Sequence, residues 1–143
     1  MRMLRIFTLA ALTASALLAA SAAMADIVLV TAINGPITQA SREEAEQLYL
    51  GRLSALRDGT PVRLLDLPAG EIRDHFYARL LGKNSIQTRA YWSRMVFTGR
   101  ARPPREVADE AELRALMVRD SNLIGYIAEE QLTPDLRVLL RLP

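Results

Sequence analysis

The sequence contains no cysteine and only one histidine, His75, among its 143 residues. The absence of cysteine excludes disulfide bonds, thiolate metal sites and cysteine nucleophiles. With a single histidine, a zinc site would have to be completed by carboxylates, which are a poor ligand set for that metal. We therefore predict that the protein has no metal site and no cofactor.

The sequence patterns of the common catalytic and nucleotide-binding sites are missing as well. The chain has no G-x-S-x-G elbow, no Walker loop, no H-E-x-x-H pair and no dinucleotide-binding glycine pattern. His75 has no apparent nucleophile partner, and the serines of residues 26–143 stand in ordinary cap, loop or helix settings. These absences predict a protein that is not an enzyme.

Residues 1–25 have the features of an export signal. Arg2 and Arg5 form a positively charged start, Phe7–Ala20 is an apolar run, and Ala23–Ala25 is a small-x-small cleavage site. The apolar run is too short for a comfortable membrane span, and no later segment is apolar enough to form one. We expect cleavage after Ala25 and a location in a bacterial periplasm, the alternative being an uncleaved membrane anchor.

Once these residues are removed, the charge of the protein is balanced. Removing 25 of 143 residues leaves 118, and the loss of Arg2 and Arg5 lowers the 18 basic residues to 16, which equals the number of acidic residues. A neutral chain argues against binding to nucleic acid or to an anionic membrane surface, because both favour a basic face. Residues 26–143 are long enough for one domain with one core.

Strand-like and helix-like segments alternate along residues 26–143. Apolar runs predict strands at Asp26–Asn34, Thr60–Asp66, Asn122–Ile127 and Leu136–Leu140, with a very short one at Glu106–Ala108. Helical spacing and capping residues, including a Ser41–Glu44 capping box, predict helices at Arg42–Leu50, Glu71–Leu81, Ser85–Thr98 and Asp109–Val118. In the third helix, Trp92, Met95 and Val96 are expected to form the buried side. The alternation predicts a three-layer α/β domain with a mixed sheet of four or five strands and helices on both faces.

The turn between the second strand and the second helix is a candidate anion site. It contains Ala69, Gly70 and Glu71, and Arg73 follows in the first turn of the helix. In one interpretation, the free backbone N–H groups of this turn act with Arg73 to hold a small oxyanion. In the other, which the sequence favours, Glu71 and Asp74 only offset the helix dipole.

Two further parts of the chain carry candidate ligand-binding residues. Asp66 stands at the carboxyl end of the second strand, where open α/β sheets present ligands. Tyr126 is expected at the end of a later strand, on the side of the same cleft. Arg100 and Arg102 lie in the loop GRARPPR, which is either a guanidinium cluster that grips phosphate or carboxylates or a solvated connector.

Several sequence elements occur in a fixed order along the chain. They are LYLGR at residues 48–52, DGTPV at 58–62, the turn and helix start at 67–76, YW at 91–92, FTG at 97–99 and NLIGYI at 122–127. Together they resemble the periplasmic phosphate-binding proteins of ABC importers, which are two-lobed receptors of the class-two periplasmic binding protein superfamily. The resemblance covers Ile27 to Glu130, and the chain is similar to a short, single-lobe relative of that family.

The resemblance implies a periplasmic solute-binding function, with phosphate or another small oxyanion as the ligand and an ABC permease as a partner. Two departures from the family are visible. The chain has no counterpart of the second lobe, and the hydroxyl-rich turn that cradles phosphate in the family is replaced here by LPAGE. The alternative is an accessory protein of the envelope that uses its open half-cleft to bind another protein or a second copy of itself.

Overall fold

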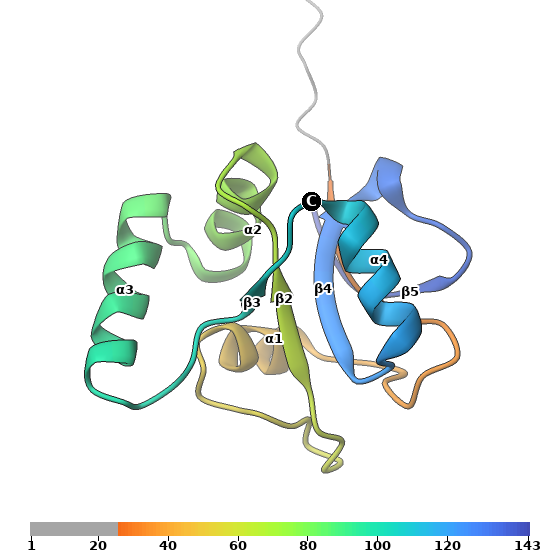
Figure 1. Cartoon of the computed structure of the whole chain (residues 1–143), viewed down its shortest axis with the longest axis horizontal. Coiled ribbons are helices and arrows are strands. Elements are labelled where there is room, and N and C mark those ends of the chain that lie inside the picture. Colours follow the sequence, from red (N-terminus) through yellow and green to blue (C-terminus); the bar gives the residue numbers. More distant parts are fainter. Residues whose placement is uncertain (1–25) are drawn as a thin grey trace, which may run out of the picture.

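The computed structural model describes residues 26–143, which fold around one five-stranded sheet (Figure 1). The expected export signal, residues 1–25, lies outside the described residues. The strands are β1 (Ile27–Ala32), β2 (Arg63–Asp66), β3 (Arg105–Glu106), β4 (Leu123–Ala128) and β5 (Leu136–Leu142). Their order in the sheet is β3-β2-β4-β1-β5. Because β2 runs parallel to β3 and β4, whereas β1 is antiparallel to β4 and β5, the sheet is mixed as predicted.

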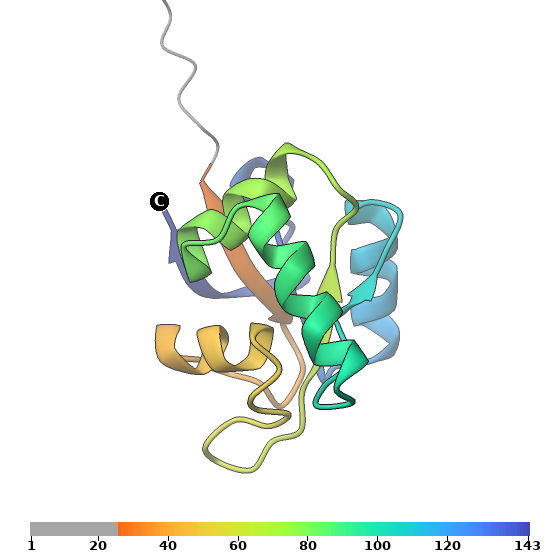
Figure 2. The same cartoon turned by 90° about the vertical axis from the view of Figure 1, so that its left-hand side faces the viewer.

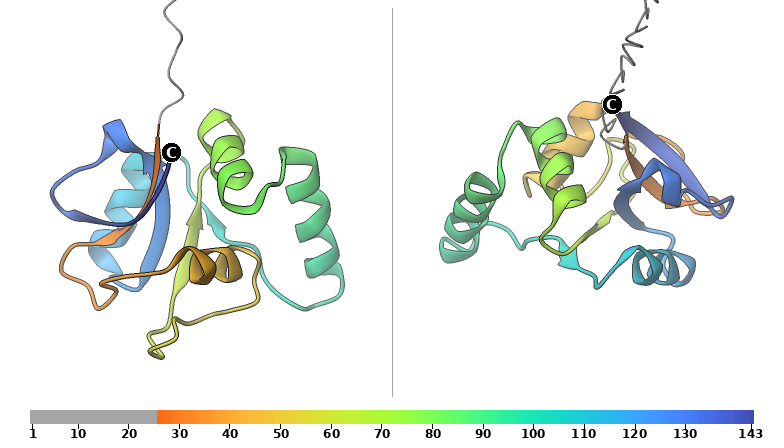
Figure 3. Two further views of the ribbon diagram at one scale, coloured as in Figure 1. Left: turned by 180° about the vertical axis from the view of Figure 1, so that it is seen from behind. Right: turned by 90° about the horizontal axis from the view of Figure 1, so that it is seen from above.

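Helices cover both faces of the sheet. They are α1 (Arg42–Tyr49), α2 (Glu71–Leu81), α3 (Ser85–Phe97) and α4 (Glu110–Arg119), and a short 3-10 helix, η1 (Glu129–Gln131), follows β4. Seen from above in Figure 3, α4 lies on one face and α1 and α2 lie on the other, with α3 outside α2. This arrangement confirms the predicted three-layer α/β fold. No helix formed by residues 26–143 is long and apolar enough to cross a membrane.

Two neighbouring residues of β4 show how the layers pack. A Cβ atom at Gly125 would lie 2.8 Å from Leu113 Cδ1 and 3.0 Å from Met117 Cε, so α4 packs directly on the strand there. Tyr126 points to the opposite face, as successive residues of a strand do. Its ring stacks on that of Phe76 in α2, with the ring centroids 3.7 Å apart. Four aromatic side chains form the cluster on that face: Tyr49, Phe76, Tyr77 and Tyr126.

The buried side predicted for α3 is wrong in part. Trp92 is buried and Met95 is half-buried, but Val96 is 53% exposed and the following Phe97 is 92% exposed. The cause is the position of α3, which lies at the front of the molecule in Figure 2 and outside α2 when it is seen from above in Figure 3. A helix in this position has no sheet surface to cover, so its apolar residues are left to line a surface pocket.

Candidate functional site

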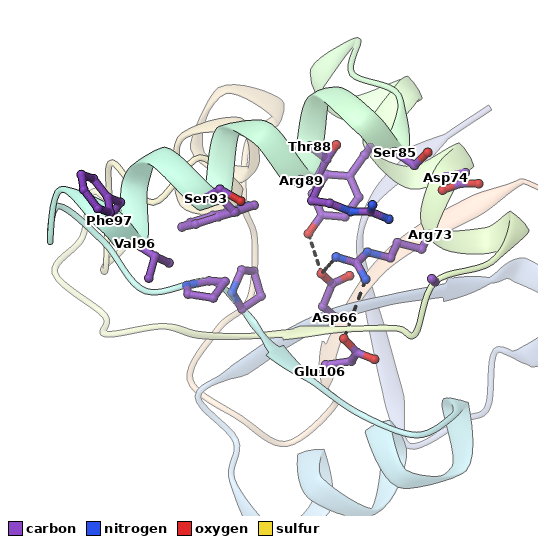
Figure 4. Close-up of a pocket in the computed structure, with 15 residues that line it drawn as sticks. Asp66, Arg73, Asp74, Ser85, Thr88, Arg89, Ser93, Val96, Phe97 and Glu106 are labelled. Atoms are coloured by element: carbon purple, nitrogen blue, oxygen red, sulfur yellow. Dashed lines mark hydrogen bonds and ion pairs between the residues drawn. The ribbon is translucent and has the colours of Figure 1, made fainter.

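A pocket of about 720 Å³ opens beside the carboxyl end of β2. Its walls are the end of β2, the start of α2, one side of α3 and the segment that leads into β3 (Figure 4). One end is charged, with Asp66, Arg73 and Glu106, and the other is apolar, with Val96 and Phe97. The remaining lining residues are Ala69, Asp74, Tyr77, Ser85, Thr88, Arg89, Trp92, Ser93, Pro103 and Pro104.

Asp66, the last residue of β2, forms the base of the charged end. Only 4% of the residue is exposed, and its carboxylate accepts hydrogen bonds from the Tyr77 hydroxyl at 2.8 Å and from the Tyr126 hydroxyl. The Tyr126 oxygen in turn accepts a 3.2 Å hydrogen bond from the backbone N–H of Leu67. This chain of hydrogen bonds holds the carboxylate in one orientation and ties β2 to both α2 and β4.

Two kinds of surrounding group shift the pKa of Asp66 in opposite directions. Burial raises the pKa of Asp66, and the hydrogen bonds from Tyr126 and Tyr77 together with the charge of Arg73 offset only part of that effect. Burial and the nearby Asp66 carboxylate also raise the pKa of Tyr77 and of Tyr126 well above that of a free tyrosine. Both hydroxyls therefore stay protonated at neutral pH and act as donors to Asp66.

Arg73 lies between two carboxylates. The parallel pairing of β2 with β3 aligns Asp66 with Glu106, and Arg73 reaches both of them from the first turn of α2. Its guanidinium nitrogens lie 3.4 Å from Asp66 Oδ2 and 3.8 Å from Glu106 Oε2, and its side chain is 27% exposed. Because these ion pairs are longer than ordinary hydrogen bonds, the guanidinium N–H groups keep the capacity to donate to a ligand.

The start of α2 differs from the starts of the other three α-helices. The side chains of Ser41, Asn84 and Asp109 accept a hydrogen bond from a first-turn amide of α1, α3 and α4, respectively. The cap of α2 is Gly70, and among the described residues no side chain accepts a hydrogen bond from the amides of residues 71–73. These amides are therefore unused donors at the positive end of the helix dipole.

A smaller pocket of about 220 Å³ lies at this helix start, between the turn that contains Ala69 and Gly70 and the start of α4. Three of its lining residues are acidic: Glu71, Asp109 and Glu110. Glu71 is exposed and makes no hydrogen bond to the first-turn amides. Its negative charge still interacts favourably with the positive end of the helix dipole. The three carboxylates together, however, repel an anion in the smaller pocket. Arg73 lines both pockets, but only the larger one is lined by a second arginine, Arg89, which makes it the more favourable place for an anion.

The structure separates the sequence-predicted candidates into groups. Three of them line the larger pocket: Asp66, Ala69 and Arg73. Arg100 and Arg102 lie elsewhere, in a groove on the other side of Pro103 and Pro104. The expectation that Tyr126 ends a strand and faces the cleft is wrong, because the residue lies inside β4 and is fully buried. It reaches the pocket only through its hydrogen bond to Asp66.

Sequence patterns do not indicate the part of the pocket that α3 and β3 provide. The side chains of Thr88, Arg89 and Trp92 line the pocket, but the spacing of Trp92 and its apolar neighbours is also typical of a helix buried in a core. Glu106 belongs to a strand of two residues, which is too short for its pattern to show which way a side chain points. A helix outside α2 could not be distinguished from a core helix by periodicity alone.

No protein-family model and no curated protein matches the sequence. Solved structures do match the fold. An ABC-type phosphate transport receptor from Vibrio cholerae superposes with a TM-score of 0.60 and 13% sequence identity, over 81% of this chain and 46% of that one. A structure with bound phosphate from Clostridium perfringens, described as a phosphate ABC transporter substrate-binding protein, gives a TM-score of 0.58 and 15% identity, over 81% and 45% of the two chains.

The chain therefore has the fold of one lobe of these phosphate-binding structures, and it spans less than half of their length. This confirms the fold class predicted from the sequence, and it supports the solute-binding kind of fold that the resemblance implies. Sequence identities of 13% and 15% show the fold alone, so the ligand has to be argued from the residues of the pocket.

Proposed function

We propose that the protein is a non-enzymatic solute-binding protein of the periplasm, and that it binds phosphate or another small oxyanion at the charged end of the larger pocket. The observation that carries this proposal is that the unused amides of residues 71–73 and the guanidinium of Arg73 belong to the same turn of α2. Helix N-terminal amides and arginine side chains are groups with which proteins bind oxyanions. The likeness in fold to phosphate-binding structures supports the same ligand class.

The carboxylates of Asp66 and Glu106 influence which oxyanion is accepted. A fully deprotonated oxyanion such as sulfate would place negative oxygens near both carboxylates, which is unfavourable. Hydrogen phosphate keeps an O–H group that can donate a hydrogen bond to a carboxylate. We therefore expect phosphate to bind in preference to sulfate, and we expect Glu71 and Asp74 to weaken the binding of both by charge repulsion.

Calorimetric titration of the purified protein with phosphate and with sulfate tests this proposal. Phosphate should bind to the wild type, and Arg73→Gln should strongly weaken that binding because it removes the guanidinium that lies on the same helix turn as the unused amides, although Arg89 still lines the pocket. Arg119→Gln is the matched control, since Arg119 is an exposed arginine of α4 on the other face of the sheet. A wild type that binds no phosphate, or equal binding in the Arg73→Gln variant, would overturn the proposal.

The location is a separate part of the proposal and has a separate test. The charged start, the apolar run and the small-x-small site within residues 1–25 support export. Mass spectrometry of the protein recovered from a periplasmic extract should find a mature chain that begins at Asp26. Recovery of the full chain from the cytoplasm or the membrane fraction would contradict export with cleavage.

A further inference from the structure

A second cavity, of about 680 Å³, lies on the other side of the segment that joins α3 to β3. It is a groove between that segment, the residues that follow α1 and the first half of β2. We call it the arginine groove because five of its lining residues are arginines: Arg52, Arg63, Arg100, Arg102 and Arg105. The other lining residues are Leu48, Gly51, Leu53, Ser54, Val62, Leu64, Ala101, Pro103 and Pro104.

The charges of this groove are nearly uncompensated. No acidic residue is among the residues that line it. Arg63 forms an ion pair with Asp120. The side chains of the other four arginines form no hydrogen bond and no ion pair with any residue that the structure describes, and all four are exposed. Four guanidinium groups without a partner among the described residues therefore border one cavity, although residues 26–143 contain acidic and basic residues in equal number.

The backbone that carries these arginines is packed in place. A Cβ atom at Gly51 would lie 2.8 Å from Ala101 Cβ and 2.8 Å from the ring of Trp92, so the two sides of the groove touch at this glycine. The hydroxyl of Tyr91 donates a 2.6 Å hydrogen bond to the carbonyl of Leu50, which ties α3 to the end of α1. A cavity that is shaped before binding loses less conformational entropy when a ligand enters.

The arginine groove is separate from the charged end of the larger pocket. Pro103 and Pro104 line both cavities and form the wall between them. The next two residues alternate across β3, so that Arg105 lines the groove and Glu106 lines the larger pocket. Ligand binding in the arginine groove is therefore independent of the proposed function of Arg73.

We propose that the arginine groove binds a ligand with several phosphate groups, of the class of linear inorganic oligophosphates. Guanidinium groups match phosphate oxygens in paired hydrogen bonds, and four unpaired arginines exceed what a single phosphate can use. The cavity has the size of a small-molecule site. An acidic protein partner is disfavoured, because protein interfaces use clusters of apolar anchors and Leu53, which is 41% exposed, is the one exposed large hydrophobic residue that lines this groove.

Titration calorimetry with sodium tripolyphosphate tests this site. The wild type should bind tripolyphosphate more tightly than orthophosphate, and Arg102→Gln should weaken the binding of tripolyphosphate by about tenfold or more. Arg119→Gln removes the same charge from an exposed position on α4 and should leave the affinity unchanged. In an Arg73→Gln background, where the site proposed above is disabled, tripolyphosphate should still bind and its binding should still depend on Arg102.

Four outcomes would overturn this proposal. The first is a wild type that does not bind tripolyphosphate. The second is equal affinity for orthophosphate and tripolyphosphate in the Arg73→Gln background, which would mean that one phosphate fills the site. The third is an equal loss of affinity in Arg102→Gln and Arg119→Gln, which would indicate an effect of net charge only. The fourth is binding of a polyglutamate peptide or of anionic phospholipid vesicles that is as tight and depends as strongly on Arg102.

Discussion

The hydroxyl of Tyr77 donates a 2.8 Å hydrogen bond to the carboxylate of Asp66 at the base of the larger pocket. The bond joins the middle of α2 to the last residue of β2. A second hydroxyl, that of Tyr126, binds the same carboxylate from β4. A single buried carboxylate therefore connects three elements of the fold, so changes at this point should be visible in the stability of the whole domain.

Removing one of these donors tests that connection. Tyr77→Phe deletes a hydrogen bond to a buried carboxylate, and we expect it to lower the free energy of unfolding by about 2 kcal/mol in urea denaturation. Tyr91→Phe is the control, because the Tyr91 hydroxyl donates to the neutral carbonyl of Leu50 in a partly buried position. Its loss should be about 1 kcal/mol. Equal losses in the two variants would contradict a special role for the Asp66 carboxylate.

Asp66 should also make the stability depend on pH. Because burial raises the pKa of Asp66 above the ordinary value of 3.8, the folded state binds this proton more readily than the unfolded state does. The contribution of Asp66 to stability therefore falls as the pH rises from 3.8 through the raised pKa and is constant above it. The difference in unfolding free energy between the wild type and Asp66→Asn, measured at a series of pH values, should fall across that window. A difference that rises with pH would mean that the tyrosines and Arg73 outweigh burial.

Gly70 offers a test of the unused amides of α2. Its φ of 164° is extended backbone that any residue adopts, and a Cβ there would meet only the carbonyl oxygen of Pro68, at 3.8 Å. We expect Gly70→Ser to cap the helix as Ser41 caps α1, and to raise the free energy of unfolding by about 0.5 kcal/mol. The new hydroxyl should also weaken phosphate binding, because it accepts a hydrogen bond from an amide that the proposed ligand uses.

The control for this prediction is Gly70→Ala, which adds a Cβ but no acceptor. It should lower the free energy of unfolding by about 0.5 kcal/mol, because alanine is a poorer N-cap than glycine, and leave the affinity for phosphate unchanged. Stabilisation by Gly70→Ser with unchanged phosphate affinity would show that the first-turn amides do not take part in binding.

Features that depend on residues close in sequence could be predicted well. Helix α2 begins at Glu71 and ends at Leu81, as the helical spacing and the glycine at position 82 indicate. The capping box of Ser41 and Glu44 is also present. In both cases the interacting groups lie within one or two turns of helix, so the sequence pattern contains the information that places them.

The pocket depends on contacts that the sequence pattern does not contain. Asp66 and Tyr126 are 60 positions apart, and they meet because β2 and β4 pair in a register that sets Leu64 beside Ile124. The same limit applies to Glu106, which is aligned with Asp66 by the pairing of β3 with β2. Strand register follows from the packing of the whole sheet, so a single sequence predicts the strands but not which side chains they bring together.

Gly51 is the residue at which the two sides of the arginine groove touch. Its φ is +72°, and an alanine there would combine backbone strain with a 2.8 Å approach to Ala101 and to Trp92. Gly51→Ala should therefore lower the free energy of unfolding by about 2 kcal/mol. It should also weaken tripolyphosphate binding without removing an arginine, because the segment that carries Arg100 and Arg102 has to move.

Gly59→Ala is the control that separates displacement of the groove segment from backbone strain. Gly59 has a φ of +89° but no heavy atom within 4 Å of the added Cβ. This variant should lose less stability, about 1 kcal/mol from the positive φ alone, and keep its affinity for tripolyphosphate. Trp92 is the only tryptophan in the sequence, so its fluorescence emission should change in Gly51→Ala and stay constant in Gly59→Ala. If both variants lose the same affinity, or if Gly51→Ala changes the emission without changing the affinity, the fixed spacing across the groove is not what the ligand recognises.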